Sequence, residues 1–96
     1  MIRCDDGRCA VDGPLTIANA AQLAEEGRRM FVAERVVVDL KGVTEVDSAG
    51  VSLLLEWRRA ASGANRQIEF VHLPANLKSL AVLYGVAELL GETRMP

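Results

Sequence analysis

Residues 35–51, with the sequence RVVVDLKGVTEVDSAGV, decide the fold of this chain. Arg35–Leu40 carries three consecutive valines and predicts a strand, and the apolar run that follows Gly50 predicts a helix. Because the valines do not alternate with polar residues, we expect helices to cover both faces of this strand. Ser48 then lies at the N-terminus of the helix, where its hydroxyl can cap the helix, carry a phosphate or face a partner protein.

A hairpin is predicted at the N-terminus, with strands at about 1–5 and 8–12. Its turn is Asp6-Gly7, because both residue types tolerate the positive φ of a two-residue turn. Cys4 then lies opposite Cys9, close enough for a disulfide to be feasible. We interpret the two cysteines as free thiols of a reducing compartment, with a metal or redox role as the alternative.

Three helices and a second strand are expected in addition to the hairpin and the strand at Arg35–Leu40. Thr16 is the predicted N-cap of the first helix, and residues 41–46 are a loop before the second helix, Ser48–Ser62. The apolar face of the first helix includes Ile17, Ala20, Ala21 and Ala24. Gly63 suits a left-handed cap. Arg66–Leu73 alternates as a strand does, and Pro74 opens the last helix, which Tyr84 is expected to anchor.

The resulting ββαβαβα order predicts an α/β fold in one domain, 1–96. Right-handed crossovers place the strands in a mixed, mostly parallel four-stranded sheet, with the N-terminal hairpin at one edge.

Composition narrows the function further. The net charge of −2 provides no broad positive field, so nucleic acid is not an expected ligand. No apolar run approaches the roughly 18 residues of a membrane span, so we expect no direct membrane insertion. The acids near the N-terminus do not match a secretory signal, which predicts a cytoplasmic protein.

No enzyme, metal site or cofactor is predicted. The single histidine, His72, has no Ser or Cys near it in the expected fold, so we interpret it as a packed or capping residue. The segment around Ser48 lacks the extra glycines and the lysine of a nucleotide phosphate loop. Glu45 and Asp47 are two residues apart in the expected loop, and we interpret them as solvated.

Three segments together resemble the signature of the STAS domain: Val36–Leu40, Val46–Val51 and Leu53–Leu55. The resemblance extends over nearly the whole chain and implies a STAS-like fold. If the chain is similar to the anti-sigma factor antagonists of this family, the resemblance implies that a partner kinase phosphorylates Ser48. The phosphate then switches partner binding off. If the chain is similar to the small cytoplasmic STAS subunit of the Mla phospholipid-transport ABC system, the resemblance implies that the Ser48 hydroxyl lies in the surface that binds the ATPase subunit.

We favour the transporter branch, which maintains outer-membrane lipid asymmetry, for three reasons. The chain is short, residues 58–65 are similar to the exit of that subunit's second helix, and residues 76–86 are similar to its last helix. Ser48 is a departure, since Thr is associated with that branch. The chain would then be peripheral to the inner membrane, held by the ATPase and its permease. The expected partner-binding residues are Asp47, Ser48, Ala49, Gly50, Val51, Ser52 and Leu55. The alternatives are an anti-sigma factor antagonist with Ser48 as phosphosite, a nucleotide-binding STAS module, and a Ser48 that only caps its helix.

Overall fold

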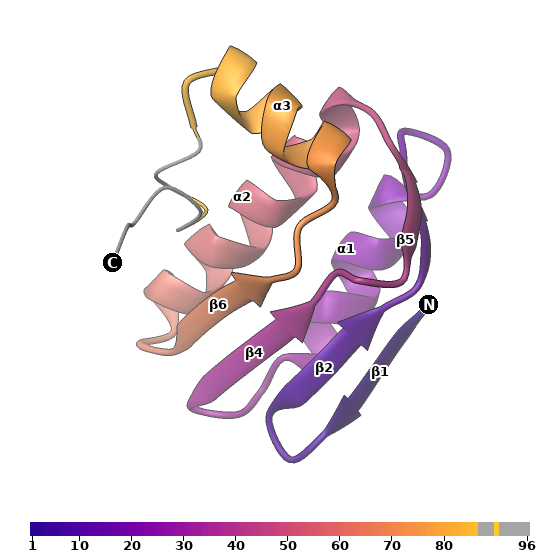
Figure 1. The fold of residues 1–96 in the computed structure, drawn as a ribbon. Helices are drawn as coiled ribbons and strands as arrows, with labels where there is room; N and C mark the ends of the chain where they lie inside the picture. The colour runs from indigo at the N-terminus through magenta and orange to yellow at the C-terminus, as the bar shows by residue number, and fades with distance from the viewer. Residues whose placement is uncertain (87–89, 91–96) are drawn as a thin grey trace.

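The computed structural model of the chain describes residues 1–86 and Leu90. Its elements are β1 (Ile2–Asp5), β2 (Arg8–Val11), β3 (Gly13–Leu15), α1 (Ala20–Met30), β4 (Arg35–Asp39), β5 (Val43–Val46), α2 (Ser48–Gly63), β6 (Gln67–Val71) and α3 (Ala75–Leu83). In Figure 1, α1 and α2 lie side by side behind a sheet, and α3 packs against α2 near the end of the molecule to which β6 leads. Within the described residues, no helix has both the length and the apolar character needed to span a membrane.

The main sheet has the strand order β1-β2-β4-β6. β1 pairs antiparallel with β2, whereas β2 pairs parallel with β4 and β4 pairs parallel with β6. The predicted α/β fold, with a mixed, mostly parallel four-stranded sheet and an N-terminal hairpin, is confirmed. The valine-rich strand β4 lies inside this sheet, between two parallel neighbours, as the two crossovers require.

The hairpin turn is at Asp6 and Gly7, whose φ angles are 57° and 86°. These positive values are the ones that an Asp-Gly turn predicts. Cys4 and Cys9 are direct register partners, and their sulfur atoms are joined in a disulfide. The interpretation of these residues as free thiols is therefore wrong, because the register holds the two side chains face to face.

A second, two-stranded sheet was not predicted from the sequence. β3 and β5 pair in parallel, with Leu15 opposite Val46. We expected a loop at 41–46, because this segment does not show the apolar alternation of a strand. This pairing links the segment before α1 to the segment before α2, and it therefore positions the start of α2.

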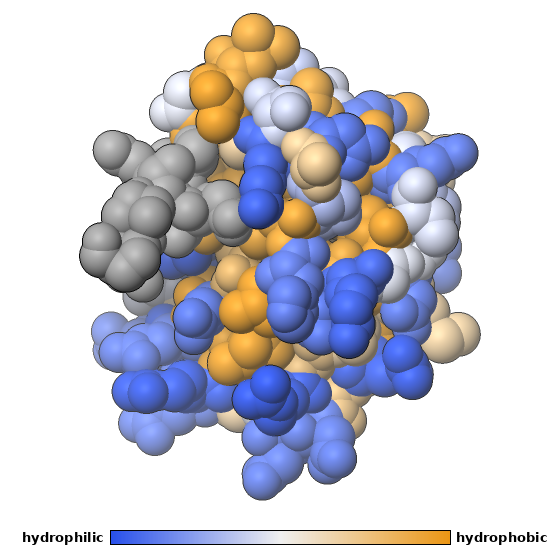
Figure 2. Space-filling view, in the orientation of Figure 1, coloured by the Kyte–Doolittle hydropathy of each residue, from blue (hydrophilic) through white to orange (hydrophobic). Residues whose placement is uncertain are grey.

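The helices α1 and α2 cover one face of the main sheet, not both (Figure 1). Val36 and Val38 are buried on the helix side, whereas Val37 is half-buried on the opposite face. The prediction of two covered faces is wrong because charged and polar neighbours surround Val37 on the open side. These exposed neighbours include Arg8, Arg35, Gln67 and Glu69. Figure 2 shows that the surface on this side is largely hydrophilic, with smaller hydrophobic areas.

The core between the helices and the sheet is built around two aromatic rings. Phe31 and Trp57 meet edge to face, with centroids 5.0 Å apart and an interplanar angle of 80°. Gly27 of α1 lies against the indole, and a Cβ atom there would be 2.2 Å from the indole Nε1. The close approach of α1 to α2 therefore depends on a residue without a side chain at position 27.

Two helix ends differ from the predictions. α1 begins at Ala20, because the Asn19 side-chain oxygen accepts a hydrogen bond from the Thr16 N–H at 2.9 Å and closes a turn before the helix. Thr16 is thus not the N-cap. Gly63 ends α2 in helical geometry, and the positive φ of 60° belongs to Asn65 instead. An asparagine tolerates this left-handed conformation, so the chain does not need a glycine there.

The third helix departs from its prediction on its outer side. Leu77 and Ala81 are fully buried and lie on the inner side of α3. Tyr84 is 50% exposed and directly follows the helix, so it does not anchor α3 in the core. The tail after Gly91 that we expected to be loosely held lies outside the described residues.

Candidate functional site

Asp47, and not Ser48, is the N-cap of α2. Asp47 has an extended backbone, and its Oδ1 accepts a hydrogen bond from the N–H of Ala49 at 2.8 Å. Its Oδ2 accepts a second hydrogen bond from the N–H of Ile17 at 3.0 Å. One carboxylate therefore fixes the start of α2 and joins it to the segment before α1. The interpretation of Asp47 as a solvated carboxylate is wrong for this reason.

Ser48 is the first residue of α2, and its side chain is exposed. Within the described residues its hydroxyl has no hydrogen-bond partner, because Asp47 performs the capping. The alternative in which Ser48 only caps the helix is therefore wrong. An exposed hydroxyl at the positive end of the helix macrodipole is open to a partner protein or to a phosphate.

The other predicted contact residues divide between the surface and the interior. Ser52 is exposed, and Ala49 and Leu55 are half-buried. Gly50 and Val51 are buried, and a Cβ atom on Gly50 would be 2.7 Å from the carbonyl oxygen of Leu15. Gly50 is therefore required for close packing inside the protein. Val51 is buried and Gly50 has no side chain, and a contact of these two residues with a partner remains a prediction.

A groove of about 690 Å³ lies between α1 and the first half of α2. We call it the α1–α2 groove; its lining residues are Ile17, Ala20, Ala21, Ala24, Asp47, Ser48, Ala49, Ser52, Leu53 and Glu56. The alanine face of α1 forms one wall of this groove, while Leu23 and Gly27 make the buried contacts of the helix. Ile17 stands at this groove with its side chain 77% exposed. The sequence pattern marked the alanine face but did not show that it stays uncovered.

The charged residues that line the α1–α2 groove in the described part of the chain are acidic. They are Asp47 and Glu56, and no described lysine or arginine lines the groove. Glu56 also forms an exposed ion pair with Arg59, at 3.1 Å. Across the described residues, no group of three or more His, Cys, Asp or Glu side chains is arranged to hold a metal ion. The groove is therefore suited to small apolar groups accompanied by positive rather than negative charge.

His72 does not lie on the face of a strand. It follows the end of β6 with a φ of 59°, and its Nδ1 lies 3.0 Å from Oδ1 of Asp39. Asp39 accepts a hydrogen bond from the N–H of Lys41, which lowers its pKa below the ordinary value; the hydrogen bond to His72 lowers this pKa further. Both side chains are bound in an exposed pair that joins the ends of β4 and β6, far along the chain from Ser48.

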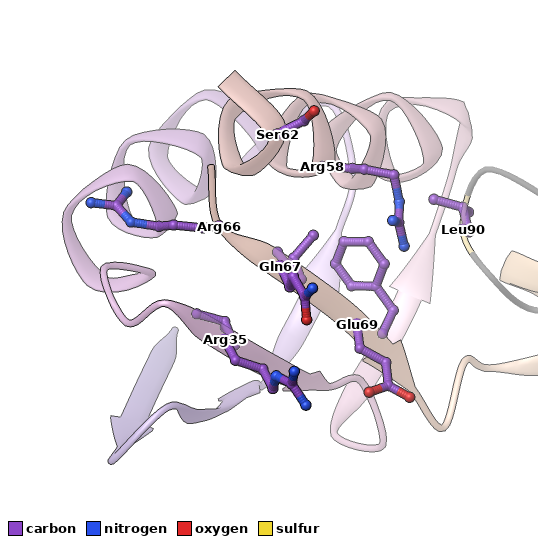
Figure 3. Close-up of a pocket in the computed structure, with 10 residues that line it drawn as sticks. Arg35, Arg58, Ser62, Arg66, Gln67, Glu69 and Leu90 are labelled. Atoms are coloured by element: carbon purple, nitrogen blue, oxygen red, sulfur yellow. The ribbon is translucent and has the colours of Figure 1, made fainter. Parts of the chain in front are cut away.

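A second hollow, of about 570 Å³, lies at the free edge of β6 (Figure 3). Arg35, Arg58 and Arg66 line it, but their side chains point in different directions. The guanidinium of Arg58 lies over the ring of Phe70, 5.5 Å from its centroid. Because the three charges do not converge, this hollow does not form an anion-binding site.

Known proteins resemble this chain in sequence pattern and in fold. A family model described as "Mlab, STAS domain" matches residues 3–91. The solved structure of the anti-sigma factor antagonist SpoIIAA in its unphosphorylated form is 13% identical, with a TM-score of 0.72 and coverage of 92% of this chain and 82% of that one. A sulfate transporter family protein from Wolinella succinogenes is 18% identical, with a TM-score of 0.71 and coverage of 96% and 78%. No curated protein matches the chain. At such low identities, the two structures show a shared fold alone.

Proposed function

Because this chain belongs to the STAS domain family, we propose that it is a non-catalytic accessory subunit of an ABC-type phospholipid transporter. In this proposal it binds the cytoplasmic ATPase, which is in complex with its permease, and supports the assembly and activity of the transporter. The Mlab description of the matching model supports this branch of the family. The STAS-like fold that the sequence predicted is confirmed by the structural neighbours.

The exposed Ser48 hydroxyl beside the α1–α2 groove is the main support for this proposal. It lies next to an open apolar surface of small side chains, and the capping that would otherwise explain a serine at this point is done by Asp47. Small side chains let a partner's backbone approach closely, which favours an extended contact over a single hydrogen bond.

The proposed contact surface consists of Ser48, Ala49 and Ser52 on α2 and the alanine face of α1. The side chains of Asp47 and Glu56 add negative charge at its rim, which favours a partner surface carrying lysine or arginine. Gly50 and Val51 support this surface from inside. Leu55 does not line the groove, so its contact with the partner remains a prediction.

The test is recovery of the ATPase with an affinity-tagged full-length chain from solubilised native membranes. We expect the wild-type chain to recover an ABC ATPase, identified by mass spectrometry, and the Ser48→Glu variant to lose it. Ser48→Glu adds negative charge at a helix N-terminus, where the macrodipole favours it, so this change does not weaken the fold. Ser79→Glu, at an exposed position in the middle of α3, is the matched control and should still recover the ATPase.

Two results would reject the proposal. One is that the wild-type chain recovers no ABC ATPase; the other is that Ser48→Glu recovers as much of it as Ser79→Glu does. The surrounding genes give an independent check, because a transporter subunit is expected beside genes for an ATPase, a permease and a lipid-binding protein.

The anti-sigma factor antagonist remains the second candidate, because Ser48 is exposed and its position at a helix N-terminus suits a phosphate. The fold is also shared with an antagonist whose structure is of an unphosphorylated form. This function predicts a kinase-like anti-sigma factor in the eluate and phosphorylated Ser48 by mass spectrometry. A nucleotide-binding module, the third possibility, predicts saturable binding of a purine triphosphate by the isolated protein.

A further inference from the structure

The disulfide between Cys4 and Cys9 joins the outermost strand of the main sheet to its neighbour. β1 lies at one edge of this sheet (Figure 1), and β2 is the only strand of the described residues with which it pairs. Asp12 holds the start of β1 through two backbone hydrogen bonds with Met1, of 2.9 and 3.0 Å, and through an exposed ion pair with Arg3. Among these links between the two strands only the disulfide is covalent, so it prevents β1 from separating from β2.

The noncovalent contacts of β1 are those of a short edge strand. β1 has four residues; Ile2 is buried and Cys4 is half-buried, whereas Arg3 and Asp5 are exposed. Strands at a sheet edge near a chain terminus open locally at a much lower free energy than strands inside a sheet. Without the covalent bond, we therefore expect β1 to separate from β2 far more often than β4 separates from its two neighbours.

The disulfide also sets the spacing of the two strands. The Cα atoms of Cys4 and Cys9 are 4.0 Å apart, whereas unlinked residues directly opposite each other in an antiparallel pair are about 4.5–5.5 Å apart. Two thiols do not approach as closely as two bonded sulfur atoms. Reduction should therefore move β1 outward from β2 at this position and loosen the packing of Ile2, two residues away.

We propose that Cys4 and Cys9 form a reversible redox lock on β1, which is closed as a disulfide and open as two thiols. The proposed function places the chain in the cytoplasm, where a disulfide is usually transient and redox-sensing and seldom a permanent brace. To this extent the lock rests on the proposed function. It gives the two cysteines a role that a purely structural crosslink in that compartment would not have.

The lock opens by thiol–disulfide exchange with a dithiol reductant. A thiolate of the reductant attacks the sulfur of Cys4 when β1 opens locally, because Cys9 is 3% exposed and is the more buried of the two. The bond between Cys4 and Cys9 breaks, a mixed disulfide forms, and Cys9 leaves as a thiolate that takes up a proton. The second thiolate of the reductant then displaces Cys4, which also takes up a proton. Two electrons and two protons have passed to the chain, and the reductant is left as a disulfide; a disulfide oxidant reverses these steps.

Amide hydrogen exchange of the purified full-length chain tests the lock, with mass spectrometry before and after reduction by dithiothreitol. We expect residues 2–5 to exchange at least tenfold faster in the reduced form, while β4 and β6 keep their rates. Cys4→Ser cannot form the bond, and a half-buried edge position tolerates serine, so this variant should exchange fast with and without dithiothreitol. Equal exchange of residues 2–5 in both forms would overturn the proposal. So would an equal acceleration of β4 and β6, because the disulfide would then brace the whole fold.

Reversibility is tested in the cells that produce the chain, by acid quenching, alkylation of free thiols and mass spectrometry. We expect two thiols in unstressed cells, a disulfide after treatment with the thiol oxidant diamide, and two thiols again after its removal. A pair that stays in one form under all three conditions would refute the lock. The exchange measurement needs no ATPase, and Ser48→Glu should give the same rates as the wild-type, so failure of the lock and failure of the proposed function are distinguishable.

Discussion

Replacing Asp47 with alanine removes two hydrogen bonds that hold the start of α2. Loss of an N-cap side chain costs about 0.5–2 kcal/mol of stability. The bond to the Ile17 N–H is at an exposed position, where water replaces part of it, so its loss costs about 1 kcal/mol. We therefore expect Asp47→Ala to lower the free energy of unfolding by about 2 kcal/mol, worked from these two contributions.

The measurement is urea unfolding of the purified full-length chain, with thermal unfolding as a second assay. For a domain of this size, a loss of about 2 kcal/mol lowers the Tm by about 8–16 °C. Asp47→Asn keeps one acceptor for the cap and should cost about half as much, because asparagine is as good an N-cap as aspartate. Ser48→Ala is the matched control and should change stability by less than about 0.5 kcal/mol, since its hydroxyl is exposed and does not cap.

The comparison of neighbouring positions makes this prediction decisive. If Ser48→Ala destabilises the protein as much as Asp47→Ala does, then Ser48 is the capping residue. Its hydroxyl is then bound to the backbone of α2 and is not available to a partner protein. If Asp47→Ala has no effect, the bonds to Ala49 and Ile17 do not hold the helix start. Either result would refute the assignment of the cap, and with it the main support for a contact through Ser48.

Three further changes test the packing and the charges. Gly50→Ala should lower the free energy of unfolding by about 1–3 kcal/mol in urea, because its Cβ atom would be 2.7 Å from the Leu15 carbonyl oxygen; a neutral effect would contradict this packing. Gly63→Ala should raise it by about 0.5–1 kcal/mol, because position 63 is helical and has open space around it; destabilisation would show that a glycine is needed there. The pKa of Asp39 is lowered in the folded state, so ionised Asp39 stabilises the fold. This stabilisation is present above the ordinary aspartate value of 3.8 and is lost as the pH falls through the lowered folded pKa. Below pH 4, the free energy of unfolding should therefore change less with pH in Asp39→Asn than in the wild-type, and identical slopes of this free energy against pH would reject the linkage.

Local signals predicted the main sheet correctly. Asp6-Gly7 specifies its turn through the φ angles that only a few residue types adopt, and the run of valines marks β4 as an interior strand. The pairing of β3 with β5 could not be predicted in this way. It depends on contacts between segments about 30 residues apart, and neither segment has enough apolar side chains to indicate a strand by itself.

The α1–α2 groove shows a different limit of sequence reasoning. Spacing of apolar residues predicted a small-residue face on the first helix, but spacing says nothing of whether another element covers that face. In the structure, α1 is oriented so that Leu23 and Gly27 pack against the core. The alanine face of α1 therefore remains at the surface and lines the groove. The orientation follows from the close contact of Gly27 with Trp57, which no local pattern reveals.

The residues of the Asp-Ser-Ala-Gly segment have separate physical roles, although they are adjacent in sequence. Asp47 binds two backbone N–H groups, and Gly50 lets the first turn of α2 pack directly on Leu15. Both are needed for the local structure whether or not a partner is present. Ser48 has neither role, and its side chain is exposed beside an open groove. Substitutions at 47 and 50 should therefore affect folding first, while a substitution at 48 that leaves stability unchanged but prevents recovery of the ATPase measures partner binding alone.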